Sequence, residues 1–290
     1  MPLAIINHLE TAAPMKILGL IPALALILAS APANASSTAG VVPDVDCDPI
    51  SGLSQVLEKP DLKYLILGEI HGTEEIPRFA GDVACLASLD RPLVVALELP
   101  VQIQGDVDAY LSSDGGPEAQ ASLLASRYWS PQFADGRSSR AIVDLLDELR
   151  TLRAVGRRIE VKASRASAGR LGPDSSDLLT AAEWTRAAMT EPSALVVVLV
   201  GRAHAGKAPT DRLRPAASLL PPEATTSLTV AADGGSFWGC LAEGCDRQIV
   251  QDRPDSRSRG VYLDAPPAGF DGVFAIGGPL RPSGPAASSR

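Results

Sequence analysis

The sequence predicts an α/β fold with a mostly parallel central sheet and helices on both faces of that sheet. Three observations support this prediction. Apolar, β-branched runs recur along the chain without alternating polar residues, as in strands that are covered on both faces. Helical segments separate these runs, and that order gives right-handed crossovers between parallel strands. Further strand-like runs follow near the C-terminus, where Pro and Gly are frequent, and predict an antiparallel edge.

The strands are predicted from short apolar runs, several of which end in Gly or are bounded by Pro. The runs of the parallel part are YLILG (64–68), PLVVALELP (92–100), RIEV (158–161) and ALVVVLVG (194–201). The runs of the C-terminal part are SLTVAA (227–232), GVYL (260–263) and GVFAIGG (272–278). Their lengths are those of strands rather than helices.

Three helical segments lie between the strands. Residues 77–89 open with Pro77, which is favourable in the first turn of a helix. Residues 137–156 end at Gly156, a natural helix stop, and have apolar side chains at helical spacing. These side chains are Ile142, Leu145, Leu146, Leu149 and Leu152. Residues 176–190 form the third helix. The segment 101–136 is longer than a simple crossover, and we predict that it folds as an inserted helical lid.

The N-terminus has the features of a secretory signal peptide. A basic start at Lys16 precedes the apolar run ILGLIPALALILAS, and small residues follow, so we place cleavage after Ala35. The run is short for a membrane span and contains Pro22, so we expect no stable membrane anchor. The protein is then periplasmic or secreted. We predict a signal peptide at 1–35, an N-terminal arm at 36–60, one α/β domain at 61–280 and a disordered tail at 281–290.

The charge and the cysteine count restrict the function and the fold further. The chain has 26 Lys and Arg against 34 Asp and Glu, a formal net charge of −8, and no basic run, which argues against nucleic acid as a partner. The chain has four cysteines, and an even number in an exported chain favours disulfides. Of the three pairings, the close spacing in WGCLAEGC favours Cys240–Cys245, which leaves Cys47–Cys85.

Polar side chains with chemical function follow three of the predicted strands. Glu69 and His71 follow the first strand, Glu98 ends the second, and His204 follows the fourth. Ligands of open α/β sheets bind beyond the carboxyl ends of the strands, so we predict an active or binding site at these four residues. The alternative is that each histidine is a structural hydrogen-bonding group at a strand end.

Two imidazoles and two carboxylates support two chemistries, between which the sequence does not decide. All four side chains are candidate ligands of a divalent metal, zinc or manganese, that activates water. Alternatively, a histidine oriented by a carboxylate deprotonates water or a substrate hydroxyl without a metal. The metallohydrolase motif H-E-x-x-H is absent from the sequence.

Three arginines are candidate substrate-binding residues: Arg78, Arg137 and Arg202. The guanidinium of Arg137, together with Arg140, has the geometry that binds a carboxylate or phosphate through two hydrogen bonds. The alternative is that the segment around Arg137 supplies helix capping and surface charge.

The motifs at the strand ends resemble those of a known superfamily. LGEIHGTEE, VALELP and VVVLVGRAHAG are similar to segments of the superfamily that joins erythromycin esterases, ChaN-like haem-binding proteins and TIKI/TraB metalloproteases. Its members share Gly-Glu-x-His or Gly-x-x-His after the first strand, a Glu after the second, and Gly-x-x-His near the end. The matching residues here are Gly68, Glu69, His71, Glu98, Gly201 and His204. The resemblance spans about 64–278 and implies that Glu69, His71, Glu98 and His204 converge in an α/β core.

These observations predict an exported hydrolase of ester or amide bonds that acts on a small molecule or a peptide. The alternative implied by the resemblance is a non-catalytic periplasmic protein that binds haem, for which Tyr64, Tyr110 and Tyr128 are available. A third hypothesis is that the strand-end residues only hydrogen-bond each other. The spacing in GEIH is that of ChaN-like proteins, whereas the following HG and acidic residues are closer to the esterases. The substrate, the cofactor and the oligomeric state stay open.

Overall fold

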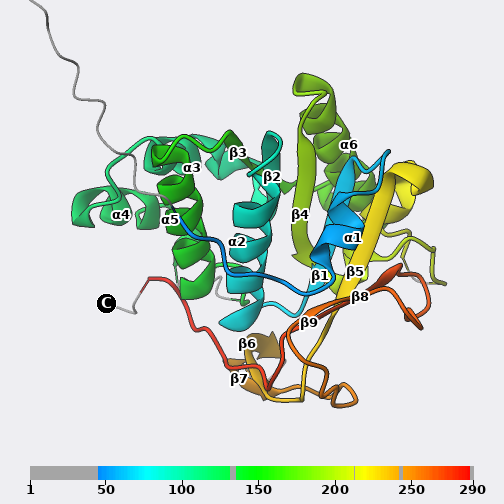
Figure 1. Cartoon of the computed structure of the whole chain (residues 1–290). Coiled ribbons are helices and arrows are strands. Elements are labelled where there is room, and N and C mark those ends of the chain that lie inside the picture. The colour runs from blue at the N-terminus through cyan, green and yellow to red at the C-terminus, as the bar shows by residue number, and fades with distance from the viewer. Residues whose placement is uncertain (1–44, 131–134, 212, 242–243, 288–290) are drawn as a thin grey trace, which may run out of the picture. The chain divides into compact units, whose positions relative to one another are not determined.

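The structure, a computed structural model, contains a central sheet of seven strands in the order β3-β2-β4-β1-β5-β9-β8 (Figure 1). It describes residues 45–130, 135–211, 213–241 and 244–287. The strands are β1 (Tyr64–Glu69), β2 (Leu93–Pro100), β3 (Ile159–Arg165), β4 (Leu195–Gly201), β5 (Thr225–Ala231), β8 (Gly260–Tyr262) and β9 (Gly272–Ala275). All neighbours are parallel except β8 and β9, which are antiparallel. The predicted fold class and its antiparallel edge are therefore confirmed.

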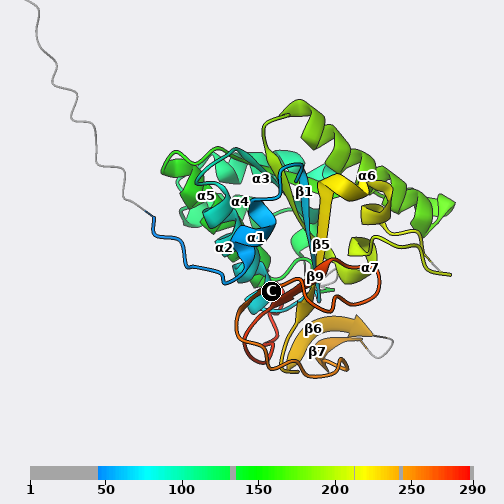
Figure 2. The ribbon, with the colours of Figure 1, turned by 45° about the vertical axis from the view of Figure 1, so that its right-hand side comes forward.

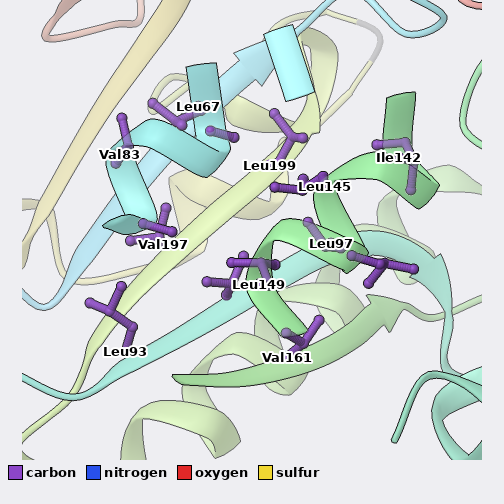
Figure 3. Close-up of a cluster of buried hydrophobic side chains, with 14 of the residues drawn as sticks. Leu67, Val83, Leu93, Leu97, Ile142, Leu145, Leu149, Val161, Val197 and Leu199 are labelled. Carbon is purple, nitrogen blue, oxygen red and sulfur yellow. The ribbon is translucent and has the colours of Figure 1, made fainter. Parts of the chain in front are cut away.

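Helices cover both faces of the sheet, as the unalternating apolar strands require. On one face lie α1 (Leu53–Leu57), α2 (Glu75–Ala87) and α5 (Arg140–Ala154), and on the other lies α6 (Pro173–Thr190) (Figure 2). Figure 3 shows how Val83 of α2 and Leu145 and Leu149 of α5 point toward the sheet residues Leu97 and Val197. Every residue of β1 and β4 is buried. Their backbone positions are thus fixed by packing on two sides.

The inserted segment 101–136 is helical in its described part. It contains η1 (Val101–Ile103), α3 (Gln104–Leu111), α4 (Pro117–Leu124) and η2 (Arg127–Trp129). The Gln104 amide donates to the carbonyl of Val161 at 3.0 Å and accepts from the N–H of Ala163 at 2.7 Å. Because β3 is an edge strand, these two bonds satisfy backbone groups that no neighbouring strand pairs. The start of α3 therefore lies along the outer edge of the sheet.

A second, two-stranded sheet lies beyond the carboxyl ends of the parallel strands (Figure 1). It is the antiparallel hairpin of β6 (Ser236–Leu241) and β7 (Gly244–Ile249), which the sequence did not predict. The carbonyl of Gly72 accepts the backbone N–H of Trp238 at 2.8 Å and thereby joins the hairpin to the loop after β1. Gly72 has φ +69°, and a Cβ there would lie 2.0 Å from the Trp238 oxygen, so this contact needs glycine.

Both ends of the described chain are attached to the domain. Near the start, Leu53 and Val56 of the expected N-terminal arm are 2% and 0% exposed and belong to the main core. Where we expected a disordered tail, the backbone N–H of Arg140 donates to Gly284 and that of Ala286 donates to Ser138. These backbone bonds hold the described part of the tail against the N-terminus of α5.

The predicted signal peptide lies outside the described residues. Among the residues that the structure describes, no helix has the length and apolar character of a membrane span.

Both predicted disulfides are present, Cys47–Cys85 with a sequence separation of 38 and Cys240–Cys245 with a separation of 5. A disulfide restricts the unfolded chain more strongly when it closes a longer loop. We expect that replacing the first pair with alanines lowers the free energy of unfolding by about 2 kcal/mol more than replacing the second pair. Urea unfolding of both double variants measures this difference, and equal losses would contradict the prediction.

Candidate active site

Three of the predicted site residues meet at the carboxyl ends of β1 and β2. The His71 ring lies between two carboxylates, with Nδ1 3.0 Å from Oε1 of Glu69 and Nε2 3.4 Å from Oε2 of Glu98. Both carboxylates are buried, at 4% and 7% exposure. Glu69 is the last residue of β1 and Glu98 is near the end of β2. Parallel strands thus place these residues at one edge of the sheet, as the sequence predicted.

The Glu98 carboxylate has two further partners. Arg137 Nη1 donates to its Oε1 at 2.8 Å, and the backbone N–H of Gly201 donates to its Oε2 at 2.8 Å. Gly201 ends β4, the strand between β2 and β1, and a Cβ on it would lie 2.7 Å from His71 Nε2. A side chain at this position would therefore separate His71 from Glu98. Arg137 also pairs with Asp135, so the cluster alternates positive and negative charge.

The cluster fixes the protonation of His71 and Glu98. Burial disfavours the charged imidazole, but the charges of Glu69 and Glu98 outweigh burial and raise the pKa of His71 to about 10. Burial disfavours the Glu98 carboxylate in the same way. The charges of His71 and Arg137 and the hydrogen bond from the Gly201 N–H outweigh this effect of burial, and they hold the pKa of Glu98 well below its usual value. At neutral pH His71 is therefore a cation and Glu98 an anion.

His204, the fourth predicted residue, has a partner that the sequence analysis missed. Its Nδ1 lies 2.8 Å from Oδ1 of Asp177, which also accepts the backbone N–H of Ala216 at 3.0 Å. Asp177 is 2% exposed, whereas the His204 side chain is 33% exposed. The bond to Asp177 raises the pKa of His204 above its usual value, with burial opposing the shift. No described group forms a hydrogen bond with Nε2 of this ring.

A pocket of about 600 Å³ joins these groups at the strand ends. Its polar wall contains Glu69, His71, Glu98, Arg137 and His204. The hairpin supplies the facing wall through Phe237, Leu241, Arg247, Gln248 and Ile249. Leu241 and Ile249 are 57% and 58% exposed, so their apolar surface is available to a bound molecule. The pocket thus has a charged inner wall and a partly apolar outer wall.

The comparisons with known proteins bear on the fold. Neither the family models nor the curated proteins contain a match to this chain. Among solved structures, a mutant of the erythromycin esterase EreC in its open conformation matches with a TM-score of 0.59 and 11% identity over 81% of this chain and 95% of that one. The chain has the erythromycin esterase fold. The fold expected from the sequence resemblance is thereby confirmed.

Two further solved structures match the chain. A protein from Bacillus cereus matches with a TM-score of 0.54 and 12% identity over 81% of this chain and 92% of that one. The type III effector HopBA1 matches with a TM-score of 0.46 and 17% identity over 80% of this chain and 97% of that one. At 11% and 12% identity, the matches to EreC and to the Bacillus cereus protein show a similar fold.

The predicted substrate-binding arginines occupy different parts of this erythromycin esterase fold. Arg137 and Arg202 line the pocket, and Arg202 pairs with Asp252 at its rim. Arg78 lies instead in a separate cavity between α2 and α5, with Asp82 and Glu148 among its lining residues. Arg78 belongs to the start of α2, and the orientation of this helix places its side chain beside α5. The position of Arg78 in the sequence, shortly after the motif, does not reveal this orientation. We therefore leave Arg78 out of the site.

The four side chains that the sequence offered as metal ligands are not arranged as a metal centre. Among the described residues, no group of three or more His, Cys, Asp and Glu side chains is placed to hold a metal ion. Both ring nitrogens of His71 face carboxylates, and Nδ1 of His204 is bonded to Asp177. For haem, Tyr64 and Tyr110 are 4% and 2% exposed and line neither pocket at the strand ends. The haem alternative therefore depends on Tyr128, which lines an adjoining pocket.

Proposed function

We propose that the protein hydrolyses ester or amide bonds, with His204 as the general base that activates water. The observation that carries this proposal is the His204–Asp177 pair, which faces a pocket of about 600 Å³ at the strand ends. A histidine held by a buried carboxylate keeps one ring nitrogen available as a proton acceptor. The similarity to a protein named erythromycin esterase supports the same class of reaction.

The proton path follows from the tautomer that Asp177 selects. With the Nδ1 proton donated to Asp177, Nε2 of His204 has a free lone pair and accepts a proton from water. The resulting hydroxide adds to the substrate carbonyl, and the tetrahedral intermediate then expels the alkoxide or amine. The proton on Nε2 passes to this leaving group, which returns His204 to its starting state.

His71 has a different role in the proposal. A group whose pKa is about 10 is protonated at neutral pH and does not act as a base. The cationic imidazole, held between Glu69 and Glu98, instead supplies fixed positive charge at the pocket wall. Positive charge placed before the reaction stabilises the negative charge that develops on the carbonyl oxygen. Glu69, Glu98 and Arg137 keep this cation in position.

The pocket suits a substrate with an apolar part. Leu241 and Ile249 of the hairpin, together with Phe237, form an apolar surface opposite the charged groups. A small molecule or a short peptide side chain that buries this surface would place its carbonyl toward His204. We propose that the protein acts after export, consistent with its two disulfides.

The pH dependence of hydrolysis tests the proposal. We expect kcat/KM for a p-nitrophenyl ester to rise with pH and to level off once His204 is neutral, with a midpoint above 6.5 because its pKa is raised. Asp177→Asn removes the largest cause of that shift and should move the midpoint down toward 6.5 as well as lowering the rate. Asp174→Asn, an exposed residue of the same helix, is the control. Rates that equal the buffer background, or that do not change between about pH 5 and 9, would contradict the proposal.

A further inference from the structure

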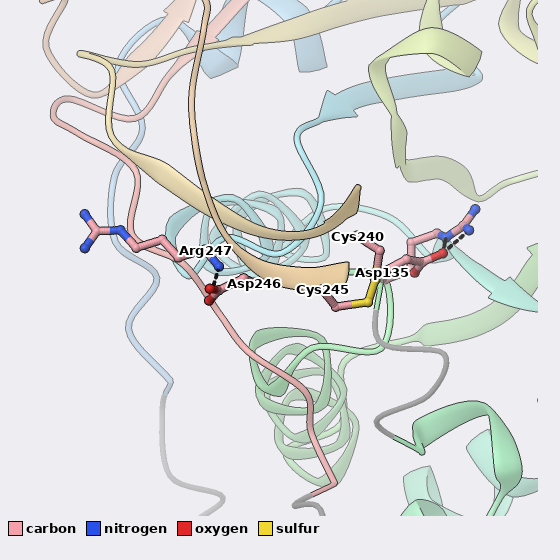
Figure 4. The surroundings of a disulfide bond; sticks show 6 residues. Asp135, Cys240, Cys245, Asp246 and Arg247 are labelled. Atoms are coloured by element: carbon pink, nitrogen blue, oxygen red, sulfur yellow. Dashed lines mark hydrogen bonds and ion pairs between the residues drawn. A yellow bond between two sulfur atoms is a disulfide. The ribbon is translucent and has the colours of Figure 1, made fainter. Parts of the chain in front are cut away.

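A second pocket of about 730 Å³ adjoins the candidate active site. Its described lining consists of Arg127, Tyr128, Asp135, Arg137, Arg165, Cys240 and Cys245. Arg137 lines both pockets, so the two are neighbours across its guanidinium. Figure 4 shows Asp135 beside the Cys240–Cys245 disulfide at the end of the hairpin. The disulfide therefore forms part of the wall of this pocket.

The lining of this pocket has an excess of positive charge. It contains three arginines and one carboxylate, and that carboxylate, Asp135, is paired with Arg137. Arg137 in turn is bound to Glu98, so its charge is compensated within the active-site cluster. Arg165 forms no ion pair with any described residue. Arg165 is the last residue of β3. It therefore lies at the carboxyl ends of the parallel strands, where the active-site residues also lie. An uncompensated guanidinium in a pocket favours an anion.

Tyr128 adds a hydrogen-bond donor to the same wall. Its phenolic oxygen is buried and has no hydrogen-bond partner in the described part of the chain. The ring packs edge-on against Trp129, with 5.1 Å between the ring centroids, which holds the side chain in place. A buried hydroxyl without a partner costs free energy unless a ligand or water satisfies it. An oxyanion in this pocket would accept the Tyr128 O–H and pair with Arg165 at the same time.

We propose that this pocket is an anion subsite that binds a carboxylate or phosphate group, through Arg165 and Tyr128. If the proposed hydrolase function holds, the anion belongs to the substrate, and the bond to be cleaved lies in the adjoining pocket at His204. The substrate class is then an ester or amide with an apolar part and an acidic group. Binding of the anion itself does not depend on catalysis.

Calorimetric titration of the processed protein with inorganic phosphate and, separately, with glutarate tests the subsite. We expect one of the two to bind, and the tighter ligand identifies the group as phosphate or carboxylate. Arg165→Gln should weaken binding roughly tenfold or more, since a hydrogen bond to a charged group is lost with its charge. Tyr128→Phe should weaken it by a smaller factor. Arg186→Gln, which removes an exposed arginine of α6, is the control and should bind as the wild type does. Failure of both anions to bind, or equal binding by Arg165→Gln, overturns the subsite.

A pair of esters separates this proposal from the proposed function. The p-nitrophenyl monoester of glutarate carries a free carboxylate, and its methyl ester is the neutral match. We expect the wild type to prefer the charged ester in kcat/KM, and Arg165→Gln to lower that preference roughly tenfold. If neither ester is hydrolysed but phosphate or glutarate binding still requires Arg165, the subsite is supported and the hydrolase function fails. If both esters are hydrolysed with no preference and no anion binds, the hydrolase function is supported and the subsite fails.

Discussion

Replacing His204 with alanine is expected to lower kcat for ester hydrolysis by about 10²–10⁴-fold, the contribution typical of a general base. The reason is that no other described group in the pocket offers an unprotonated ring nitrogen. His71 is held as a cation by two carboxylates, and its pKa of about 10 excludes it as a base at neutral pH. KM should change far less than kcat, because His204 acts on water rather than on the substrate. Single-substrate kinetics near pH 8 measure both constants.

Two controls distinguish a base from a structural residue at position 204. Removing the side chain leaves the buried Asp177 carboxylate with the backbone N–H of Ala216 as its partner, so the urea midpoint should fall while the unfolding transition stays cooperative. Added imidazole should restore part of the lost rate, since the truncated side chain leaves space beside Asp177. A variant that folds normally and keeps its turnover would show that another group activates the water.

The convergence of the predicted residues was accessible from the sequence because it depends only on strand direction. Unalternating apolar runs identify β1, β2 and β4 as parallel strands, and their carboxyl ends must then lie at one edge. The strand order adds a detail that the sequence lacks. β4 lies between β2 and β1, so Gly201 lies beside the contact of Glu98 with His71 and must lack a side chain for that contact to form.

The missed residues belong to features that strand patterns do not encode. Asp177 lies on the buried face of α6, at helical spacing from Ala181 and Trp184, and a carboxylate on an apolar helix face was a signal that it has a buried partner. The hairpin of β6 and β7 was missed because nine of its twelve strand residues are polar or exposed and its position depends on a backbone contact with Gly72. Such long-range contacts have no local pattern.

Replacing Glu98 with glutamine is expected to lower the free energy of unfolding by about 3 kcal/mol, near the lower end of the cost of breaking a buried ion pair. Glu98 is 7% exposed and is the shared partner of Arg137 and His71, so its loss leaves two cations with weaker compensation. The lower end of the range applies because each cation keeps one further carboxylate, Asp135 for Arg137 and Glu69 for His71. Urea unfolding measures the loss, with the exposed Glu58→Gln as the control.

The dependence of this loss on pH identifies the charge cluster as its cause. The pKa of His71 is raised from 6.5 to about 10 in the folded protein, so its contribution to stability is fully present below pH 6.5 and is lost as the pH rises through about 10. The pKa of Glu98 is lowered from 4.5, so its contribution is present above pH 4.5 and is lost as the pH falls through the folded value. The difference between the wild type and Glu98→Gln should therefore be largest between pH 4.5 and 6.5. Near pH 10 the difference should shrink to the part that Arg137 still supplies, because Arg137 stays charged there while His71 does not. A difference that stays constant across this range would mean that packing around Glu98, rather than its charge, stabilises the fold.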